Sequence, residues 1–298
     1  MATVLITGSS TGIGLAPAVA LARAHHNVYA TMRHPDRSPE LQTIAHQESL
    51  PITIVRLDVD SDDSVTQAIQ QVLAERGQID ALVNNAGLFL LGAVEDLPLA
   101  VFRQTMETNY FGALRCIQAV LPSRRKRRSG WIINVTSIAG RIAMGAAGAY
   151  AASKFALEAL SEALAQEVQA FNIRVAIVEP GFIQTPIFAK LTDDPPASRY
   201  PHERRLRAVS AASLQHPVSP SVVGEAIRQI IESDSWQLRY PVGPDAVPFL
   251  TWRAAMTDEA WVHWNASSDD DVWYAQLEQD FGLDARPFRR VRSVARGV

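Results

Sequence analysis

The feature that most constrains the fold of this chain is a regular alternation of short apolar runs with helical patterns from residue 3 to residue 185. The runs are rich in β-branched residues, as buried strands are. They span residues 3–7, 27–32, 52–57, 79–83, 131–135 and 173–178, and a further run lies near 237–240. This alternation predicts an α/β fold in which one doubly wound, mostly parallel sheet of about seven strands carries helices on both faces.

Polar and small residues follow several of these runs. In an open parallel sheet, ligands bind in the crevice beyond the carboxyl ends of the strands. The residues that fall at these ends are Gly8, Asp58, Asn85, Ser137 and Gly181. We therefore expect one site at this edge of the sheet, built from segments that are far apart in the sequence.

The first run leads directly into a glycine-rich turn and then into a helical pattern. This order is typical of a dinucleotide site, because glycines let the backbone approach a pyrophosphate and the helix N-terminus offers free N–H groups. The predicted cofactor contacts in the turn are Gly8, Ser10, Thr11, Gly12, Ile13 and Gly14.

The end of the second run bears on the choice of nucleotide. In dinucleotide folds an acidic residue here binds the ribose hydroxyls, whereas an arginine accommodates a 2′-phosphate. Met32 stands where the acid is expected, and Arg33 follows it. The pattern favours NADP(H). The alternatives are that Arg33 is a solvated residue of a polar turn, or that Asp36 beyond it restores binding of NAD(H).

Two further strand ends supply cofactor candidates. Asp58 and Val59 follow the third run, and the carboxylate of Asp58 can accept a hydrogen bond from an adenine amino group or cap the helix that follows. After the fourth run, Asn85, Ala86 and Gly87 are small or polar residues that let a ligand pass close to the backbone.

A helical pattern from about residue 149 carries the candidate acid/base chemistry. Tyr150 and Lys154 are four residues apart and therefore lie on one helix face. An ammonium beside a phenol favours phenolate and lowers the pKa of the tyrosine. Ser137, at a preceding strand end, can face the same point. These three groups suit proton transfer to or from a carbonyl or alcohol oxygen. The alternative is a tyrosine and a lysine on a solvated helix face.

Other segments are less specific. Asn109 lies inside a helical pattern over residues 98–121, where asparagine is mildly unfavourable, so a buried water or backbone role is considered. Residues 186–220 have an irregular pattern with many prolines and apolar residues such as Phe188, and are predicted to form a substrate lid. Residues 244–298 contain several tryptophans that either pack over the sheet edge, close the pocket or meet another subunit. The arginine-rich tail is expected to be mobile.

Composition excludes several classes of function. A formal charge of −3 and 47% hydrophobic residues are ordinary for a globular protein. No apolar run is long enough to span a bilayer and no signal peptide is recognised, so a cytoplasmic protein is expected. The single cysteine, Cys116, excludes an internal disulfide, and the seven histidines show no metal-ligand spacing. The basic run Arg124–Arg128 is interpreted as a solvated helix end and not as a nucleic-acid site.

Together these motifs resemble the short-chain dehydrogenase/reductase family over about residues 3–240. The matching segments are Thr7–Gly14, Asp58–Val59, Asn84–Gly87, Ser137, Tyr150 with Lys154, and Pro180–Thr185. Residues 28–33 are similar to the hydroxysteroid and retinol dehydrogenase branch, which tends to use NADP(H). The resemblance implies a Rossmann-type domain over residues 1–243, with residues 244–298 as an extension packed on it. Unlike many NADP(H)-dependent members, the chain has no basic residue directly before Gly12, so a 2′-phosphate would depend mostly on Arg33, with Ser10.

The resemblance also implies residue roles. Tyr150 would be the general acid/base, Lys154 would hold the nicotinamide ribose and tune the tyrosine, Ser137 would polarise the substrate carbonyl, and Asn109 would hold a water that joins Lys154 to a proton relay. Pro180, Gly181, Ile183 and Thr185 would bind the nicotinamide end of the cofactor. Met144, Phe182 and Phe188 are expected to contact substrate, together with Ser137 and Tyr150.

The expected function is that of an NADP(H)-dependent oxidoreductase that interconverts a ketone or aldehyde and an alcohol on a mainly apolar substrate. An NAD(H)-dependent alcohol dehydrogenase of the same family is the alternative within enzymes. A non-catalytic dinucleotide-sensing protein is the alternative from another class. The resemblance suggests a homodimer or homotetramer formed through the helices that contain Asn109 and Tyr150.

Overall fold

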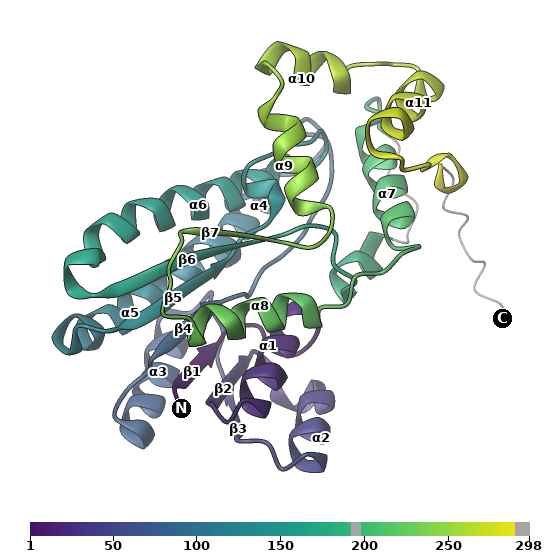
Figure 1. Ribbon diagram of the computed structural model, residues 1–298. Helices are drawn as coiled ribbons and strands as arrows, with labels where there is room; N and C mark the ends of the chain where they lie inside the picture. Colours follow the sequence, from purple (N-terminus) through teal and green to yellow (C-terminus); the bar gives the residue numbers. More distant parts are fainter. Residues whose placement is uncertain (192–197, 290–298) are drawn as a thin grey trace.

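The computed structural model describes residues 1–191 and 198–289. Within them, one seven-stranded parallel sheet has the order β3-β2-β1-β4-β5-β6-β7, which confirms the predicted doubly wound fold (Figure 1). The strands are β1 Thr3–Ile6, β2 Asn27–Met32, β3 Ile52–Arg56, β4 Ala81–Asn84, β5 Gly130–Val135, β6 Ile173–Pro180 and β7 Arg239–Val242. The order reverses beside β1, which pairs with β2 on one side and β4 on the other. A crevice at this reversal is where such sheets bind ligands.

Helices cover both faces of the sheet. They are α1 Gly12–Arg23, α2 Pro39–Gln47, α3 Asp62–Arg76, α4 Leu99–Met106, α5 Gly112–Arg127, α6 Gly148–Val168 and α8 Ser221–Glu232. Successive strand residues face opposite sides, so Val4 and Ile6 pack with α1, α2 and α8, whereas Leu5 packs with α3, α5 and α6. All three are 0% exposed. Burial on both faces explains why the strands read as continuous apolar runs.

The helix predicted over residues 98–121 is longer and less regular than expected. A π-helical turn, Glu107–Phe111, separates α4 from α5, and α5 continues to Arg127. The prediction that the basic run at the end of α5 is a solvated helix end is wrong for one residue. Arg124 is 0% exposed and its guanidinium donates to the carbonyl oxygen of Trp131, because the end of α5 packs over the start of β5. Its neighbours Arg125 and Lys126 are exposed.

The expectation of an irregular segment over residues 186–220 is wrong for its second half. The segment begins with a 3-10 helix, Pro186–Leu191. After the gap in the described residues it continues with α7, His202–Ser213. The prolines lie outside α7, so they do not interrupt its hydrogen bonds. Its residues Ala208, Val209 and Ala212 are buried against the C-terminal extension, which supplies the packing that stabilises this helix.

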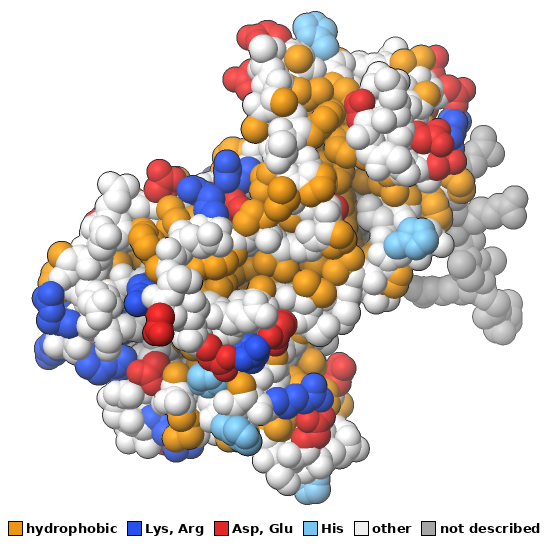
Figure 2. Space-filling model, viewed as in Figure 1, with side chains coloured by type: hydrophobic (Ala, Val, Ile, Leu, Met, Phe, Trp, Pro, Cys, Tyr) orange, Lys and Arg blue, Asp and Glu red, His pale blue; other side chains and the backbone are white. Residues whose placement is uncertain are grey.

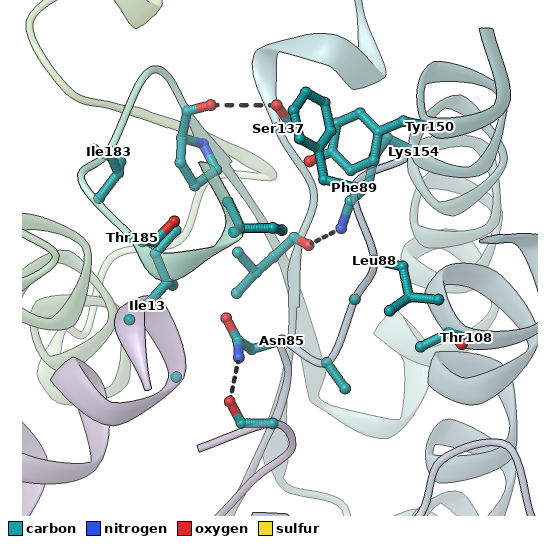
Figure 3. A pocket seen from close by; sticks show the side chains of 18 of the residues that line it. Ile13, Asn85, Leu88, Phe89, Thr108, Ser137, Tyr150, Lys154, Ile183 and Thr185 are labelled. Carbon is teal, nitrogen blue, oxygen red and sulfur yellow. Dashed lines mark hydrogen bonds between the residues drawn. The ribbon is translucent and has the colours of Figure 1, made fainter. Parts of the chain in front are cut away.

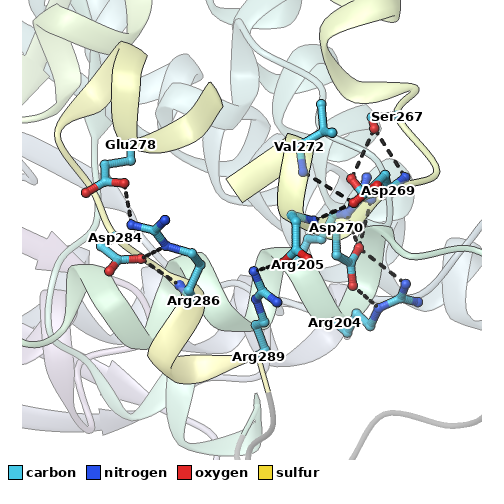
Figure 4. Close-up of polar contacts among 11 residues, drawn as sticks. Arg204, Arg205, Ser267, Asp269, Asp270, Val272, Glu278, Asp284, Arg286 and Arg289 are labelled. Atoms are coloured by element: carbon cyan, nitrogen blue, oxygen red, sulfur yellow. Dashed lines mark hydrogen bonds and ion pairs between the residues drawn. The ribbon is translucent and has the colours of Figure 1, made fainter. Parts of the chain in front are cut away.

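The C-terminal extension adds three helices, α9 Ala246–Ala254, α10 Asp258–Asn265 and α11 Asp270–Phe281 (Figure 1). Trp273 and Leu277 of α11 pack against α7. Arg204 and Arg205 of α7 both pair with Asp270, at 3.0 Å and 2.8 Å (Figure 4). Arg286, near the end of the described chain, pairs with Glu278 and Asp284 (Figure 4). Residues 290–298 of the predicted mobile tail lie outside the described residues.

Hydrophobic side chains gather on the face that runs from β7 towards α9 and α10 (Figure 2). Trp236 and Val247 on this part of the chain are 42% and 56% exposed. Among the described residues, no helix combines the length and the apolar character that crossing a bilayer requires.

Candidate active site

A cavity of about 520 Å³ lies at the carboxyl ends of the strands. With the exception of Asn109, every residue predicted to bind cofactor or substrate or to act in catalysis lines it. The lining residues from the nucleotide predictions are Gly8, Ser10, Thr11, Gly12, Ile13, Gly14, Arg33, Asp58, Val59, Asn85, Ala86, Gly87, Pro180, Gly181, Ile183 and Thr185. Those from the catalytic and substrate predictions are Ser137, Met144, Tyr150, Lys154, Phe182 and Phe188. The topology therefore brings together segments that the sequence separates.

The glycine-rich turn fits a dinucleotide because side chains are sterically excluded from it. Gly8 has φ +70°, and a β carbon there would lie 2.8 Å from the α carbon of Ala86. A β carbon at Gly14 would lie 2.2 Å from the carbonyl oxygen of Gly8. The amide of Asn85 braces the turn by donating to the carbonyl oxygens of Thr7 and Gly8, at 3.0 Å and 3.1 Å (Figure 3). Backbone N–H groups at the start of α1 thus remain open to a phosphate.

The end of β2 places one permanent positive charge at the cavity, and Asp58 and Asp60 line the cavity from the segment after β3. Met32 is buried at the end of β2, and the next residue, Arg33, is exposed and lines the cavity with His34 and Ser38. Asp36 lies in the 3-10 helix Pro35–Arg37 and is not among the lining residues. The local geometry therefore offers a cation and no carboxylate at the end of β2.

Burial is the largest influence on the pKa values of Tyr150 and Lys154. It raises the pKa of Tyr150 to about 12, against the opposing hydrogen bond from Ser137. It lowers the pKa of Lys154 to about 8. We predicted that Lys154 lowers the pKa of Tyr150. The structure shows the opposite direction, because burial raises this pKa. The ammonium lies 5.7 Å from the centroid of the phenol ring and donates to the carbonyl oxygen of Val135 at 2.9 Å (Figure 3).

Ser137 is held at the end of β5 by backbone contacts. Its hydroxyl accepts a hydrogen bond from the N–H of Ala139 at 3.1 Å and donates to the carbonyl oxygen of Pro180 at 3.5 Å (Figure 3). The serine caps a short 3-10 helix, Ile138–Gly140. The long second contact leaves the hydroxyl able to turn towards a substrate oxygen beside Tyr150.

Asn109 lies in the π-helical turn and is 1% exposed. Its amide oxygen accepts from the N–H of Leu88 at 2.7 Å, and its nitrogen donates to Leu88 O at 3.0 Å and to Ser153 Oγ at 2.9 Å. The side chain of Asn109 thus binds the backbone of Leu88, one of the two roles that the sequence suggested for it. These contacts hold the segment after Gly87 against α6, the helix that carries Tyr150 and Lys154.

Aromatic rings form the other half of the cavity, and sequence reasoning missed several of them. Phe89 meets Tyr150 edge-on at 4.7 Å and Phe188 at 5.7 Å. Phe182 lies 6.4 Å from Phe249 of α9. Leu206 of α7 is also part of this wall. The position of Phe89, two residues after Gly87, is a signal for its role, but Phe249 is distant in sequence from every motif.

Comparisons with known proteins agree with this arrangement. A sequence profile described as short chain dehydrogenase matches residues 2–196. Retinol dehydrogenase 8 of Bos taurus is 38% identical over 266 residues, covering 85% of this chain and 85% of that protein. A short-chain dehydrogenase from Streptomyces avermitilis superposes with a TM-score of 0.75 and 33% identity, covering 88% of this chain and 95% of its own. An alcohol dehydrogenase from Thermococcus sibiricus, complexed with 5-hydroxy-NADP, gives a TM-score of 0.68 at 25% identity, covering 81% and 95%.

Proposed function

Since this chain belongs to the short-chain dehydrogenase family, and is therefore an oxidoreductase of CH–OH and C=O groups, we propose that it interconverts a ketone or aldehyde and an alcohol with NADP(H), on a mainly apolar substrate. One observation carries the proposal. A single cavity joins the glycine-rich turn and Arg33 at one end to Ser137, Tyr150 and an aromatic wall at the other.

The nucleotide half of the cavity supports NADP(H). When bound, the cofactor supplies or accepts the hydride. The backbone of residues 8–14 would hold its phosphates, and Lys154 its nicotinamide ribose. Arg33 would pair with the 2′-phosphate, since an arginine suits phosphate recognition. The alcohol dehydrogenase from Thermococcus sibiricus, whose structure contains an NADP derivative, supports the same choice.

The proton is handled by Tyr150. With its pKa raised to about 12 by burial, the phenol is protonated at neutral pH and can donate its proton to the oxygen of a ketone that is being reduced. The hydroxyl of Ser137 donates a hydrogen bond to the same oxygen and stabilises the negative charge that develops there. In the reverse direction the tyrosine must first be present as phenolate, which then accepts the proton of the alcohol.

The lining of the substrate half supports an uncharged apolar substrate. Phe89, Phe182, Phe188, Leu206 and Phe249 offer no charge or hydrogen bond to a ligand. A carboxylate or phosphate placed among them would lose its hydration without a partner, at a cost of several kcal/mol. Retinol dehydrogenase 8 is named for an apolar alcohol, which supports the same class.

Fluorescence titration with NADPH and NADH tests the nucleotide, and a screen of apolar ketones and aldehydes with the better nucleotide tests the reaction. We expect much tighter binding of NADPH and consumption of NADPH with aromatic or long-chain carbonyl compounds. Tighter binding of NADH would overturn the NADP(H) proposal. Binding of neither nucleotide would overturn the proposed reaction.

We also propose a homodimer or homotetramer. Phe111, the last residue of the π-helical turn before α5, and Phe155 on α6 are 42% and 43% exposed and would offer aromatic contacts to a second subunit on these helices. Light scattering at increasing protein concentration checks the assembly. Replacement of both residues by Ser should shift it to the monomer, and an unchanged mass would show that other surfaces form it.

A further inference from the structure

Two residues near Ser137, the preceding Thr136 and Arg141 four positions beyond, reach buried carboxylates with their side chains. On one side, Thr136 Oγ1 donates to Glu158 Oε1 at 2.7 Å. On the other, Arg141 Nη1 donates to Glu179 Oε1 at 3.2 Å. Glu158 is 4% exposed and Glu179 is 0% exposed, so both carboxylates have lost nearly all contact with water.

Arg239 of β7 joins the two carboxylates. Its Nε lies 3.1 Å from Glu158 Oε2 and 3.8 Å from Glu179 Oε1. Its Nη2 donates to Glu162 on the next turn of α6 at 2.8 Å. A continuous chain of polar contacts results, hereafter the carboxylate bridge, which consists of Thr136, Glu158, Arg239, Glu179 and Arg141.

The carboxylate bridge ties together the three segments that carry the reacting groups. Glu158 is one turn beyond Lys154 on α6, and Gly140 packs on it so closely that a β carbon would lie 2.9 Å from Glu158 Cγ. Glu179 directly precedes Pro180, whose carbonyl oxygen accepts the hydroxyl of Ser137. The loop of the serine is thus bound to the helix of the acid/base pair and to the strand end of the predicted nicotinamide loop.

Two buried carboxylates cost free energy unless cations and hydrogen bonds compensate them. Burial is the largest influence on both and raises their pKa values, and the charges of Arg141 and Arg239 oppose it at Glu179. Removal of Arg141 would leave buried Glu179 with only the longer contact to Arg239 at 3.8 Å, so the loop would have to move or take up water. A hydrophobic contact in the same place would hold the segments without this directional constraint.

We propose that Arg141 and Glu179 are positioning residues of the active site. Their ion pair sets the place of the Ser137 hydroxyl relative to the phenol of Tyr150. This inference rests on the proposed function and assigns to the pair no contact with substrate or nucleotide.

The test uses the full chain and the variants Arg141→Gln, Arg141→Lys, Glu179→Gln and the double variant Arg141→Gln/Glu179→Gln. The matched control is Arg127→Gln, because Arg127 pairs with Asp80 at 3.0 Å next to the amino end of β4, away from the cavity. The readouts are kcat and KM for an apolar ketone, and amide hydrogen exchange over residues 136–142 in the protein without nucleotide.

We expect Arg141→Gln and Glu179→Gln each to lower kcat about 10- to 100-fold with little change in KM, because a misplacement of about 1 Å can cost on the order of a hundredfold. Exchange over residues 136–142 should accelerate, Arg141→Lys should recover part of kcat, and the double variant should be no worse than the poorer single one. The control should retain both kcat and the exchange pattern.

Wild-type kcat and exchange in folded Arg141→Gln would overturn the proposal, and so would an equal loss in Arg127→Gln. If Glu179→Gln does not fold, Arg141→Gln still decides, since the Arg141 side chain is 45% exposed and tolerates an amide in water. If the wild-type enzyme reduces no ketone, the proposed function fails. Exchange over residues 136–142 then still shows whether the ion pair holds the loop.

Discussion

The ammonium nitrogen of Lys154 lies 5.7 Å from the centroid of the Tyr150 ring; the lysine is buried, and the tyrosine is half-buried in the wall of the cavity. Their proximity alone suggests that the cation favours phenolate. Burial outweighs it, because an ionised phenol in this cavity would lose its hydration. The protein thus holds tyrosine as an acid at neutral pH, which suits reduction of a carbonyl.

Titration of the phenol checks this state directly. The ultraviolet difference between the wild type and Tyr150→Phe, in protein without nucleotide, should show no phenolate until the pH approaches 12, the value to which burial raises the pKa. A midpoint at or below about 10, the ordinary value for tyrosine, would show that the charge of Lys154 prevails over burial.

Tyr150→Phe should lower kcat about 10²- to 10⁴-fold, the usual contribution of a general acid, while the affinity for NADPH stays nearly unchanged. The matched control is Tyr274→Phe. The hydroxyl of Tyr274 is buried in the C-terminal extension and has no hydrogen-bond partner among the described residues. Stopped-flow reduction of a ketone measures both variants. Turnover retained in Tyr150→Phe would remove the tyrosine from the mechanism.

Lys154→Met should change how stability depends on pH. The folded protein lowers the pKa of Lys154 from 10.5 to about 8, so between these values the unfolded chain binds more protons and the wild type gains stability as pH rises. Relative to Lys154→Met, the gain should approach about 3 kcal/mol, at about 1.4 kcal/mol per pKa unit. Chemical denaturation at pH 8 and at pH 10.5 measures it. Lys126→Met, at an exposed helix end, should show no such trend.

Arg33→Ala should raise the Kd for NADPH at least tenfold and leave the Kd for NADH within about twofold, because a charge-assisted contact to phosphate contributes about 1.5–3 kcal/mol. Arg56→Ala is the control, since Arg56 is exposed at the end of the neighbouring strand β3 and does not line the cavity. Equal weakening of both nucleotides would refute the phosphate contact.

The sequence predicted the sheet, and the residues expected to contact the nucleotide line one cavity, because strand periodicity and glycine spacing are local signals. Gly8 and Tyr150 reach one cavity through the topology that this periodicity implies. Three features escaped prediction because they depend on tertiary burial: the direction of the Tyr150 pKa shift, the buried guanidinium of Arg124, and Phe249 in the substrate wall. Each is decided by what packs around the side chain.

The cavity draws its lining from two parts of the chain. The groups proposed to transfer the proton and bind the nucleotide all precede residue 186. Leu206 and Phe249, in contrast, come from α7 and α9. Helix α11 supports both helices, because its Trp273 packs against α7 and its Phe281 stacks on Phe249 of α9 at 4.3 Å. On the proposed function, changes in the last third of the chain would alter this part of the substrate wall without touching the groups proposed to transfer the proton and bind the nucleotide. A chimera that exchanges this last third between relatives would be expected to carry substrate preference with it.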